Sequence, residues 1–419
     1  MPDDVSYLRR GALALAAVAV AGYLVDALFN LGLTHFLAPH DYGDFKLAYS
    51  FATFFGLALL LGGDRAAPMV LAPCLERGEP RRVWEYLRFY LSTAGLLGVG
   101  LILITWSIAW MHVGTPHPGH HHPLVLAACI VPVNAAGAMV SRTLQSARRP
   151  AQAVVPWRLG LPLLQLALFA GLIAWRGTLT DREAILVGLV AVSAVTLWQW
   201  RGLQRQGLVE TAPDPSFREH RAWLAASVPM MGAFLVALAL NQSDLYFLEI
   251  LGTEAEVGHY AAAATVAHVL VLAQVTVIGL LAPLARPAIE AGAEASRRVY
   301  LRGLRWLLAF LVPLAVLLAL FAEPVLHLFG PQYAVGRDVL FSLAVGYFAW
   351  AAAALSALWL QYRGRAATVL AISVGTLIVD SILNLLLIPR YGMEGAAGST
   401  ALTLGVGAAA IVVAHLRAR

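Results

Sequence analysis

The sequence predicts an all-α polytopic membrane protein with about 12 transmembrane helices in two pseudo-symmetric six-helix bundles around a central cavity. Composition, the spacing of the apolar segments and the alternation of cationic residues predict it. Of the 419 residues, 60% are hydrophobic and 13% are charged, against roughly 45–50% and 25% in soluble domains. A water-soluble fold cannot bury so much apolar surface, so lipid must cover the rest. A soluble enzyme, a nucleic-acid-binding protein and a secreted disulfide scaffold are therefore excluded.

Each span is an apolar segment close to the roughly 20 residues that cross a bilayer as a helix. Twelve such segments follow one another at 11–37, 44–63, 86–111, 124–146, 153–175, 183–200, 222–248, 257–283, 302–322, 336–361, 366–388 and 395–415. The first is too long for the apolar core of a cleaved signal peptide, and further spans follow it. The longest connection, 201–221, is too short to form a separate soluble domain.

The cationic residues alternate between the two sides of the membrane. With the N-terminus in the cytoplasm, 24 of the 29 Lys and Arg residues lie on the cytoplasmic side. The other side keeps Lys46, Arg176, Arg182, Arg337 and Arg390. Such a bias follows the positive-inside rule, and it predicts that both termini are cytoplasmic.

Two short patterns recur about 215 residues apart in the chain. Residues 33–45 correspond to residues 248–260, since each ends a helix, makes a short polar turn and starts the next helix with Gly and an aromatic residue. Residues 144–151 correspond to residues 360–367 at nearly the same offset. The alternative is that any two apolar helical hairpins resemble each other. We interpret the matches as a six-helix unit used twice.

The repeat defines the predicted domains. An N-terminal lobe covers 1–205, a cytoplasmic linker covers 206–221, and a C-terminal lobe covers 222–419. Six helices return the chain to the same side, so the two lobes are parallel repeats. Transporters use this architecture to place a substrate between two lobes that rock against one another.

Polar residues follow a helical spacing within two predicted spans. In the first span, steps of 3, 4 and 4 place one stripe on one face: Tyr23, Asp26, Asn30 and Thr34. The eleventh span repeats these steps with Ser373, Thr376, Asp380 and Asn384, and the seventh adds Asn241 and Asp244. Charged and amide side chains at membrane depth usually face protein or water, so we expect them to line a polar cavity. Hydrogen bonding between helices is the alternative.

Four cations lie near membrane depth: Lys46, Arg65, Arg142 and Arg158. Guanidinium groups bind phosphate oxygens bidentately, so a pyrophosphate headgroup would need such partners. We place Lys46, Arg65 and Arg142 in the expected cavity. Simple anchoring of the helix ends is the alternative.

The remaining motifs predict neither a metal site nor an enzyme. Five histidines lie in the Pro- and Gly-rich loop 112–122, which we interpret as a solvated turn. The sequence contains no GxxxxGK[ST] motif for ATP and no HExxH or GxSxG motif for hydrolysis. A membrane-bound acyl- or glycosyltransferase would be favoured by an intramembrane His/Asp pair, which the sequence lacks. We expect no bound cofactor.

The stretch Asp380–Thr403 carries Asn384, Ile-Pro at 388–389, Gly392 and Gly-Ala-Ala at 395–397 in that order. It resembles the late-helix signature of polysaccharide and O-antigen flippases, a family of the multidrug/oligosaccharidyl-lipid/polysaccharide exporter superfamily. The corners that contain Gly43 and Gly258 resemble the outer-turn pattern of that family. These motifs cover about a tenth of the chain.

The resemblance implies a MATE-like, two-lobe fold in the bacterial cytoplasmic (inner) membrane. It implies a flippase that carries a lipid-linked oligosaccharide, typically on undecaprenyl pyrophosphate, to the outer leaflet by alternating access, for polysaccharide, lipopolysaccharide or O-antigen synthesis. The implied partners are membrane lipids, the lipid-linked glycan, and a glycan polymerase or glycosyltransferases of the same pathway.

Asp26 is the residue we expect to load a coupling proton or Na⁺. The alternative function is a proton- or sodium-coupled multidrug exporter of the same superfamily. It is favoured by the carboxylate in the first helix and by the small number of intramembrane cations.

Overall fold

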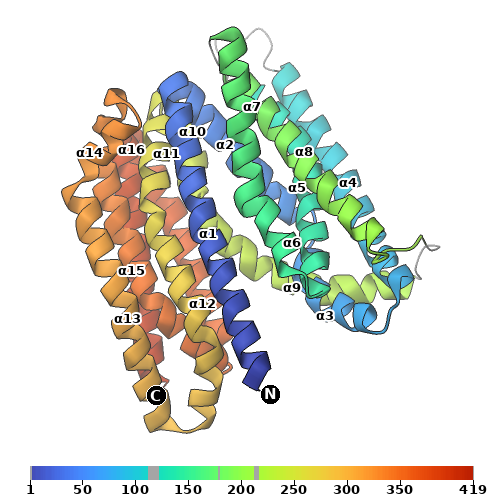
Figure 1. Cartoon of the computed structure of the whole chain (residues 1–419). Helices are drawn as coiled ribbons and strands as arrows, with labels where there is room; N and C mark the ends of the chain where they lie inside the picture. Colours follow the sequence, from blue (N-terminus) through green and yellow to red (C-terminus); the bar gives the residue numbers. More distant parts are fainter. Residues whose placement is uncertain (1, 112–121, 178–179, 212–216, 419) are drawn as a thin grey trace. The chain divides into compact units, whose positions relative to one another are not determined.

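The fold consists of helices and connecting turns (Figure 1). The computed structural model describes residues 2–111, 122–177, 180–211 and 217–418, and these residues contain no strand. The prediction of an all-α protein is therefore confirmed. The chain divides into two compact units. Unit 1 comprises 1–37 and 44–235, and unit 2 comprises 38–43 and 236–419.

Unit 1 is built from the first nine α-helices and one π-helical segment, except for the start of the second helix through Gly43 and residues 236–239 of the ninth, which belong to unit 2. These elements are α1 (Pro2–Phe36), α2 (Pro39–Ala58), α3 (Gly63–Glu76), α4 (Pro80–Met111), α5 (His122–Ser146), α6 (Pro150–Val155), η1 (Pro156–Gly160), α7 (Leu161–Arg176), α8 (Asp181–Arg205) and α9 (Phe217–Ala239). The segments α6, η1 and α7 continue one another along the predicted fifth span. Helix α9 starts in the predicted linker, and its residues through Leu235 belong to unit 1.

The termini of the α7–α8 hairpin follow from local sequence. Gly177 ends α7 in the left-handed conformation (φ 75°), which glycine adopts without strain. Thr180 and Glu183 then form a capping box, since the Thr180 hydroxyl accepts from the Glu183 amide and the Glu183 carboxylate accepts from the Thr180 amide. The predicted turn between the fifth and sixth spans therefore lies where the sequence breaks the helix.

The core of unit 1 is centred where α3, α4, α5 and α9 meet. Tyr86 and Tyr90 are fully buried and pack against each other. The Tyr86 hydroxyl donates to the carbonyl of Gly63, and the Tyr90 hydroxyl donates to Ser227 on α9. These bonds satisfy the polar ends of two large buried side chains.

One face of α4 is apolar and exposed over the second half of the helix. Leu96, Val99, Leu103, Trp106 and Trp110 follow one another at steps of 3 or 4, and each is more than half exposed. A stripe of this length is unfavourable in water and suits acyl chains.

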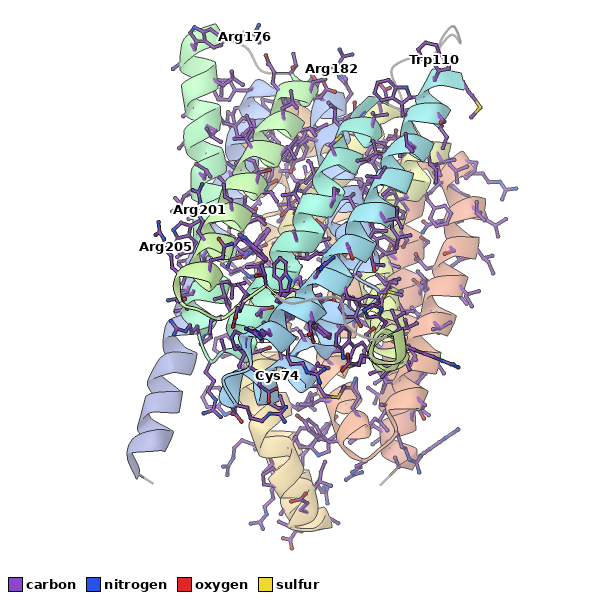
Figure 2. All side chains as sticks on the ribbon, turned by 90° about the vertical axis from the view of Figure 1, so that its right-hand side faces the viewer. Cys74, Trp110, Arg176, Arg182, Arg201 and Arg205 are labelled. Atoms are coloured by element: carbon purple, nitrogen blue, oxygen red, sulfur yellow. The ribbon has the colours of Figure 1, made fainter. Side chains whose placement is uncertain are left out.

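The arginines of the α7–α8 hairpin lie toward opposite ends of unit 1. Figure 2 shows Arg176, Arg182 and Trp110 at one end, and Arg201 and Arg205 further toward the other end. This separation agrees with the alternation of charge along the sequence. Which end faces the cytoplasm stays a prediction.

Unit 2 is built from the remaining helices. These are α10 (Ser243–Leu251), α11 (Glu254–Ala267), α12 (Val269–Glu290), α13 (Ala293–Leu320), α14 (Ala322–Leu328), the 3₁₀ helix η2 (Pro331–Gly336), α15 (Arg337–Tyr362) and α16 (Ala366–Arg417). Helix α15 packs against α12, α13 and α16. The core includes Tyr347 and Trp359, which are 2% and 1% exposed.

Helix α16 consists of two helices joined at Gly392, whose backbone is not helical (φ 54°, ψ −135°). The two parts run antiparallel, because Ser399 contacts Asn384 and Thr403 contacts Asp380 across the bend. The predicted spans 366–388 and 395–415 are therefore the two arms of one hairpin.

The second repeated pattern has the same turn in both copies. After α5, the amide of Arg149 donates to the carbonyl of Leu144. After α15, the amide of Arg365 donates to the carbonyl of Leu360 in the same way. Arg148 and Gly364, which are also 216 residues apart, both have left-handed φ values of 57° and 77°. The repeat is thus visible in backbone geometry.

The first repeated pattern forms two corners that pack against each other within unit 2. A Cβ built on Gly43 would lie 2.8 Å from the amide nitrogen of Gly258. A Cβ on Gly258 would meet the carbonyl of Pro39, at 2.6 Å from its carbon atom. Both glycines are therefore required by backbone-to-backbone contact, which explains why the repeated pattern contains them.

The number of spans is not settled by helix length and composition. Among the described residues, nine helices are long and apolar enough to cross a membrane, or ten if the bent pair α2–α3 is one span. Helix α16 enters this number once, although it contains two predicted spans. The count of twelve is therefore not confirmed.

Candidate functional site

The polar stripe of α1 lines a cavity in unit 1. The cavity has a volume of about 170 Å³, and Tyr23, Asp26 and Asn30 contribute to it from α1. Asn30 is 2% exposed. Its amide donates to the backbone carbonyl of Asp26 at 2.7 Å and to the Asp26 carboxylate at 3.3 Å. The amide therefore fixes the carboxylate at the cavity wall.

Two cations line the same cavity. Lys46 enters from α2 and Arg158 from η1. Lys46 as a residue is half-buried, and its ammonium lies within electrostatic reach of the Asp26 carboxylate. Gln165 of α7 adds an amide whose nitrogen is buried without a hydrogen-bond partner among the described residues. The cavity wall therefore carries two charged hydrogen-bond donors, Lys46 and Arg158, and a neutral amide donor, Gln165.

A second and larger polar pocket adjoins this cavity. It has a volume of about 360 Å³, and Tyr49, Trp157, Arg158 and Leu161 line both spaces. We call the two spaces together the polar cavity of unit 1.

Three guanidinium groups line the second pocket: Arg65, Arg142 and Arg158. Asp64 is the acidic residue among them, and its carboxylate lies 3.1 Å from Nε of Arg65. The amides of Asn134 and Gln145, the hydroxyls of Tyr49, Thr53 and Ser141, and apolar side chains complete the wall. Positive charge exceeds negative charge here, as an anionic group would require.

Arg65 is positioned by a tight turn between α2 and α3. Gly62 has a left-handed φ of 79°, and a Cβ at this residue would come within 2.8 Å of the carbonyl carbon of Ser227. The guanidinium of Arg65 lies over the ring of Phe234 at 3.5 Å from its centroid, a cation–π contact. The turn and the ring together hold the guanidinium toward the pocket.

Arg158 is positioned by the π-helical segment η1. Such segments interrupt an α-helix and are frequent at functional sites. A Cβ on Gly22 of α1 would lie 2.9 Å from the carbonyl carbon of Arg158, so the two backbones touch. Trp157 donates from Nε1 to Gln199 at 2.8 Å, and Gln199 donates to the carbonyls of Gln152 and Ala153. Both faces of η1 are therefore fixed.

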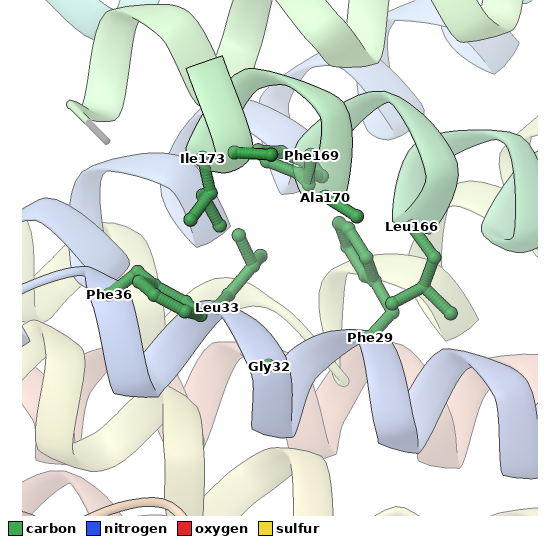
Figure 3. A pocket seen from close by; sticks show the side chains of 9 residues that line it. Phe29, Gly32, Leu33, Phe36, Leu166, Phe169, Ala170 and Ile173 are labelled. Carbon is green, nitrogen blue, oxygen red and sulfur yellow. The ribbon is translucent and has the colours of Figure 1, made fainter. Parts of the chain in front are cut away.

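An apolar pocket adjoins the polar cavity at Phe29, which lines both (Figure 3). This pocket has a volume of about 350 Å³ and lies between α1 and α7. Figure 3 shows Leu33 and Phe36 of α1 facing Phe169 and Ile173 of α7. Unit 1 therefore places an apolar space directly beside a cation-lined polar one.

The second polar group is a buried cluster in unit 2. Asp244 of α10 and Asp380 of α16 are each 3% exposed, and Asn384 is fully buried. The Asn384 amide donates to both carboxylates, at 2.8 Å to Asp244 and 3.1 Å to Asp380. One amide thus joins the two acids.

Hydroxyl groups complete this cluster. Tyr260 and Thr400 donate to Asp244, while Ser243 and Thr403 donate to Asp380. Ser399 donates to the amide oxygen of Asn384. Among the described residues neither carboxylate forms an ion pair, so the two acids are surrounded by neutral hydrogen-bond donors.

The predicted site residues therefore separate into two groups. Tyr23, Asp26, Asn30, Lys46, Arg65 and Arg142 line the polar cavity of unit 1, while Asp244, Asp380 and Asn384 meet in unit 2. Asn241 joins neither group. Its amide donates to the carbonyl of Ala237 at 2.7 Å, in the turn between α9 and α10.

The sequence interpretation missed several members of these groups. Arg158 was recognised as a cation near membrane depth but was left out of the cavity. Tyr260, Thr400 and Thr403 gave no signal, because hydroxyl side chains are ordinary in membrane helices. In the histidine-rich loop, residues 112–121 lie outside the described residues, and His122 begins α5. Within the described part of the chain, no cluster of His, Cys, Asp or Glu side chains could hold a metal ion.

Sequence comparisons place this architecture among known proteins. A family model described as "Polysaccharide biosynthesis protein" matches residues 8–284. The EPS I polysaccharide export inner membrane protein EpsE of Ralstonia solanacearum is 34% identical over 113 residues. This stretch is 27% of the chain and 25% of the relative, so the match spans about a quarter of that protein.

Solved structures share the fold over nearly the whole chain. An inward-facing multidrug resistance MATE family transporter of the MOP superfamily has a TM-score of 0.75 at 16% identity and covers 96% of this chain and 98% of its own. The lipid II flippase MurJ, in an inward closed conformation, has a TM-score of 0.77 at 11% identity and covers 96% and 87%. The expectation of a MATE-like fold is confirmed.

Proposed function

We propose, since the chain belongs to the polysaccharide biosynthesis protein family, that it is a flippase for a lipid-linked oligosaccharide. The substrate would be a glycan on undecaprenyl pyrophosphate, made for a surface polysaccharide or O-antigen. The similarity to a polysaccharide export protein and to a lipid II flippase supports this class of substrate. The proposed location is the bacterial inner membrane, with both termini in the cytoplasm.

The observation that carries the proposal is the pairing of two unlike spaces in unit 1. The polar cavity is lined by cations, and the adjoining apolar pocket between α1 and α7 shares Phe29 with it. A lipid-linked glycan has the same division, with an anionic and hydroxylated headgroup on an isoprenoid tail. The polar cavity would replace water around the headgroup while the tail remains among apolar side chains.

The guanidinium groups match a pyrophosphate. Arg65, Arg142 and Arg158 line one pocket, so two phosphates could each receive a charge-assisted hydrogen bond. Arg158 and Lys46 then line the adjoining part of the cavity. The headgroup could therefore pass from one set of cations to the next without leaving the polar cavity, which opens to the two sides of the membrane in turn.

A proton or Na⁺ would drive the cycle through an intramembrane carboxylate. Asp26 is one candidate, because it lines the cavity beside Lys46. Asp244 and Asp380 form a second candidate, because Asn384 joins them and the described residues supply no ion pair to either. Asp26→Asn and Asp380→Asn should differ in transport, and the one that abolishes the dependence on pH or Na⁺ identifies the coupling acid.

The test uses the organism that encodes the chain. Deleting the gene should abolish the surface polysaccharide and accumulate the lipid-linked glycan, and the wild-type gene should restore both. The double variant Arg65→Gln/Arg142→Gln removes two charge-assisted partners. At about 1.5–3 kcal/mol for each such bond, we expect transport to fall by roughly 100-fold or more.

The matched control is Arg88→Gln, since Arg88 is an exposed cation of α4 that lines neither part of the polar cavity. This variant should restore the polysaccharide. Wild-type display by the double variant, at equal amounts of protein in the membrane, would contradict the proposed phosphate site.

Multidrug export is the second candidate function. It is favoured by the fold match to a multidrug resistance MATE transporter and by the apolar pocket, which could accept a lipophilic organic cation. Loss of dye efflux without loss of surface polysaccharide in the deletion strain would support it and would overturn the flippase proposal.

A further inference from the structure

A groove with apolar walls runs along α8, apart from the polar cavity. It has a volume of about 560 Å³ and lies between α8 and the α6–η1–α7 segment. Its apolar walls include Val155, Leu164, Val195 and Trp198. The groove has no lining residue in common with either part of the polar cavity. It therefore serves a different ligand or none.

One end of the groove continues into a basic hollow. This second space has a volume of about 290 Å³, and Gln152 and Trp198 line both. Arg201 and Arg205 line the hollow from α8, where a spacing of four residues puts them on one face. Figure 2 shows the two arginines together on the outer edge of unit 1.

The polar groups of the hollow have unused bonding capacity. Arg201 and Arg205 are exposed, and within the described ranges neither forms a hydrogen bond or an ion pair. Gln206 donates to Gln152 at 2.9 Å. Its own amide oxygen is buried without a hydrogen-bond partner in the described part of the chain. The hollow thus presents two cations for an anion and one acceptor for a hydroxyl.

Trp198 marks the level at which this hollow meets the groove. Its side chain is 59% exposed. Exposed tryptophans of membrane helices prefer the headgroup level of the bilayer. Arg205 is seven residues further along α8, which corresponds to about 10 Å at 1.5 Å per residue. The two arginines therefore lie at the level of the lipid phosphates, while the groove lies at the level of the lipid acyl chains.

We propose that this surface binds an anionic phospholipid of the phosphatidylglycerol class. One acyl chain occupies the groove along α8, and the phosphate pairs with Arg201 and Arg205. A headgroup hydroxyl donates to the amide oxygen of Gln206. Basic pockets between membrane helices bind anionic lipid headgroups on the same principle.

The bound lipid would contact the segment that carries a residue of the polar cavity. Pro156 and Gly160 of η1 line the groove, whereas Trp157 and Arg158 of the same segment line the cavity. A lipid in the groove therefore braces η1 from the opposite side. Lipid binding itself does not depend on which substrate the cavity carries.

The test is native mass spectrometry of the full-length purified chain, titrated with phosphatidylglycerol and with phosphatidylcholine of the same acyl chains. We expect phosphatidylglycerol to bind more tightly. In Arg201→Gln/Arg205→Gln the affinity for phosphatidylglycerol should fall by roughly 30-fold, from the contribution of two surface cations. The affinity for phosphatidylcholine should change little, and Arg201→Lys/Arg205→Lys should retain most of the preference.

The matched control is Arg176→Gln/Arg182→Gln, which removes the same charge at the other end of the α7–α8 hairpin (Figure 2). It should leave the preference unchanged. An equal loss in both double variants would assign the preference to net charge and overturn the proposal. Unchanged binding of phosphatidylglycerol to Arg201→Gln/Arg205→Gln would also overturn the proposal. Binding of a polyprenyl phosphate but not of phosphatidylglycerol would overturn it as well.

A second measurement locates the lipid. In vesicles that contain brominated phosphatidylglycerol, bromine on the acyl chain quenches nearby tryptophans. The loss of tryptophan fluorescence on adding the brominated lipid should be smaller in Trp198→Phe than in wild type. This difference between the two proteins should disappear when Arg201 and Arg205 are replaced by Gln in both. No difference between wild type and Trp198→Phe would place the lipid elsewhere and contradict the proposal.

Discussion

Replacing Gly258 by Ala tests the backbone contact at the repeated corner. The added Cβ would meet the carbonyl group of Pro39, at 2.6 Å from its carbon atom and 3.1 Å from its Cα. Ordinary contacts between such atoms lie near 3.5 Å or more, so one backbone must move by about 1 Å. Both sides of the contact are backbone, and therefore no side-chain rotation can relieve it.

The expected cost follows from these distances. Overpacking costs about 1–3 kcal/mol where side chains can adjust, and here the upper end applies. The helix propensity of Ala returns about 0.5–1 kcal/mol, which leaves a net loss of about 2 kcal/mol. Thermal unfolding of the purified chain should show this as a Tm lower by roughly 2 °C.

The control for this prediction is Gly171→Ala. Gly171 is an exposed residue of α7, and a Cβ there would have no neighbour within 4 Å. Its Tm should be equal to that of wild type or slightly higher. If Gly258→Ala melts at the same temperature as Gly171→Ala, the corners do not pack as described and the reasoning is refuted.

Four further substitutions test the repeat and the two polar groups. Arg148 has a left-handed φ of 57°, and its counterpart Gly364 has a φ of 77°. Arg148→Gly should therefore raise the free energy of unfolding by about 1 kcal/mol, and Gly364→Ala should lower it by a similar amount. Melting shifts of the opposite sign would contradict this prediction. Asn384→Leu removes three buried hydrogen bonds. Each group left unsatisfied costs about 1–3 kcal/mol, so this variant should reduce the Tm more than any other single variant. A wild-type Tm would argue against the hydrogen-bonded cluster. Gly22→Ala would place its Cβ 2.9 Å from the carbonyl carbon of Arg158 and displace α1 from η1. Polysaccharide display should therefore fall several-fold at equal protein level. Full display would show that this contact is not needed.

Much of the fold could be predicted because its causes are local or periodic. Apolar segments of bilayer length can form only helices in lipid. The glycine corners recur because each needs a residue without a Cβ, as the contact of Gly43 with Gly258 shows. The helix breaks at Gly177 and Gly392 lie between predicted spans, and glycine adopts left-handed backbone without strain.

The membership of the polar groups was only partly predictable. The spacing of Asp26 and Asn30 placed both on one face, and the structure lines a cavity with them. Spacing along one helix does not say which helix packs opposite. The meeting of Asp244 with Asp380 through Asn384 therefore emerged only in three dimensions.

The role of η1 was beyond the sequence interpretation for a different reason. A π-helical turn has one extra residue, and Pro156 and Gly160 at its ends are also compatible with a kinked α-helix. The extra residue changes the direction of Arg158 relative to α7. A cation that the charge pattern assigned to a helix end therefore lines the polar cavity instead.

We propose that the polar cavity of unit 1 holds a pyrophosphate on an isoprenoid tail. It is tested most directly by calorimetric binding of farnesyl pyrophosphate to the purified full-length chain, beside farnesol and inorganic pyrophosphate. Farnesyl pyrophosphate should bind more tightly than either part alone. The double variant Arg65→Gln/Arg142→Gln should weaken this binding by roughly 100-fold, while Arg88→Gln should not. Equal binding of farnesol and farnesyl pyrophosphate, unchanged in the double variant, would contradict it.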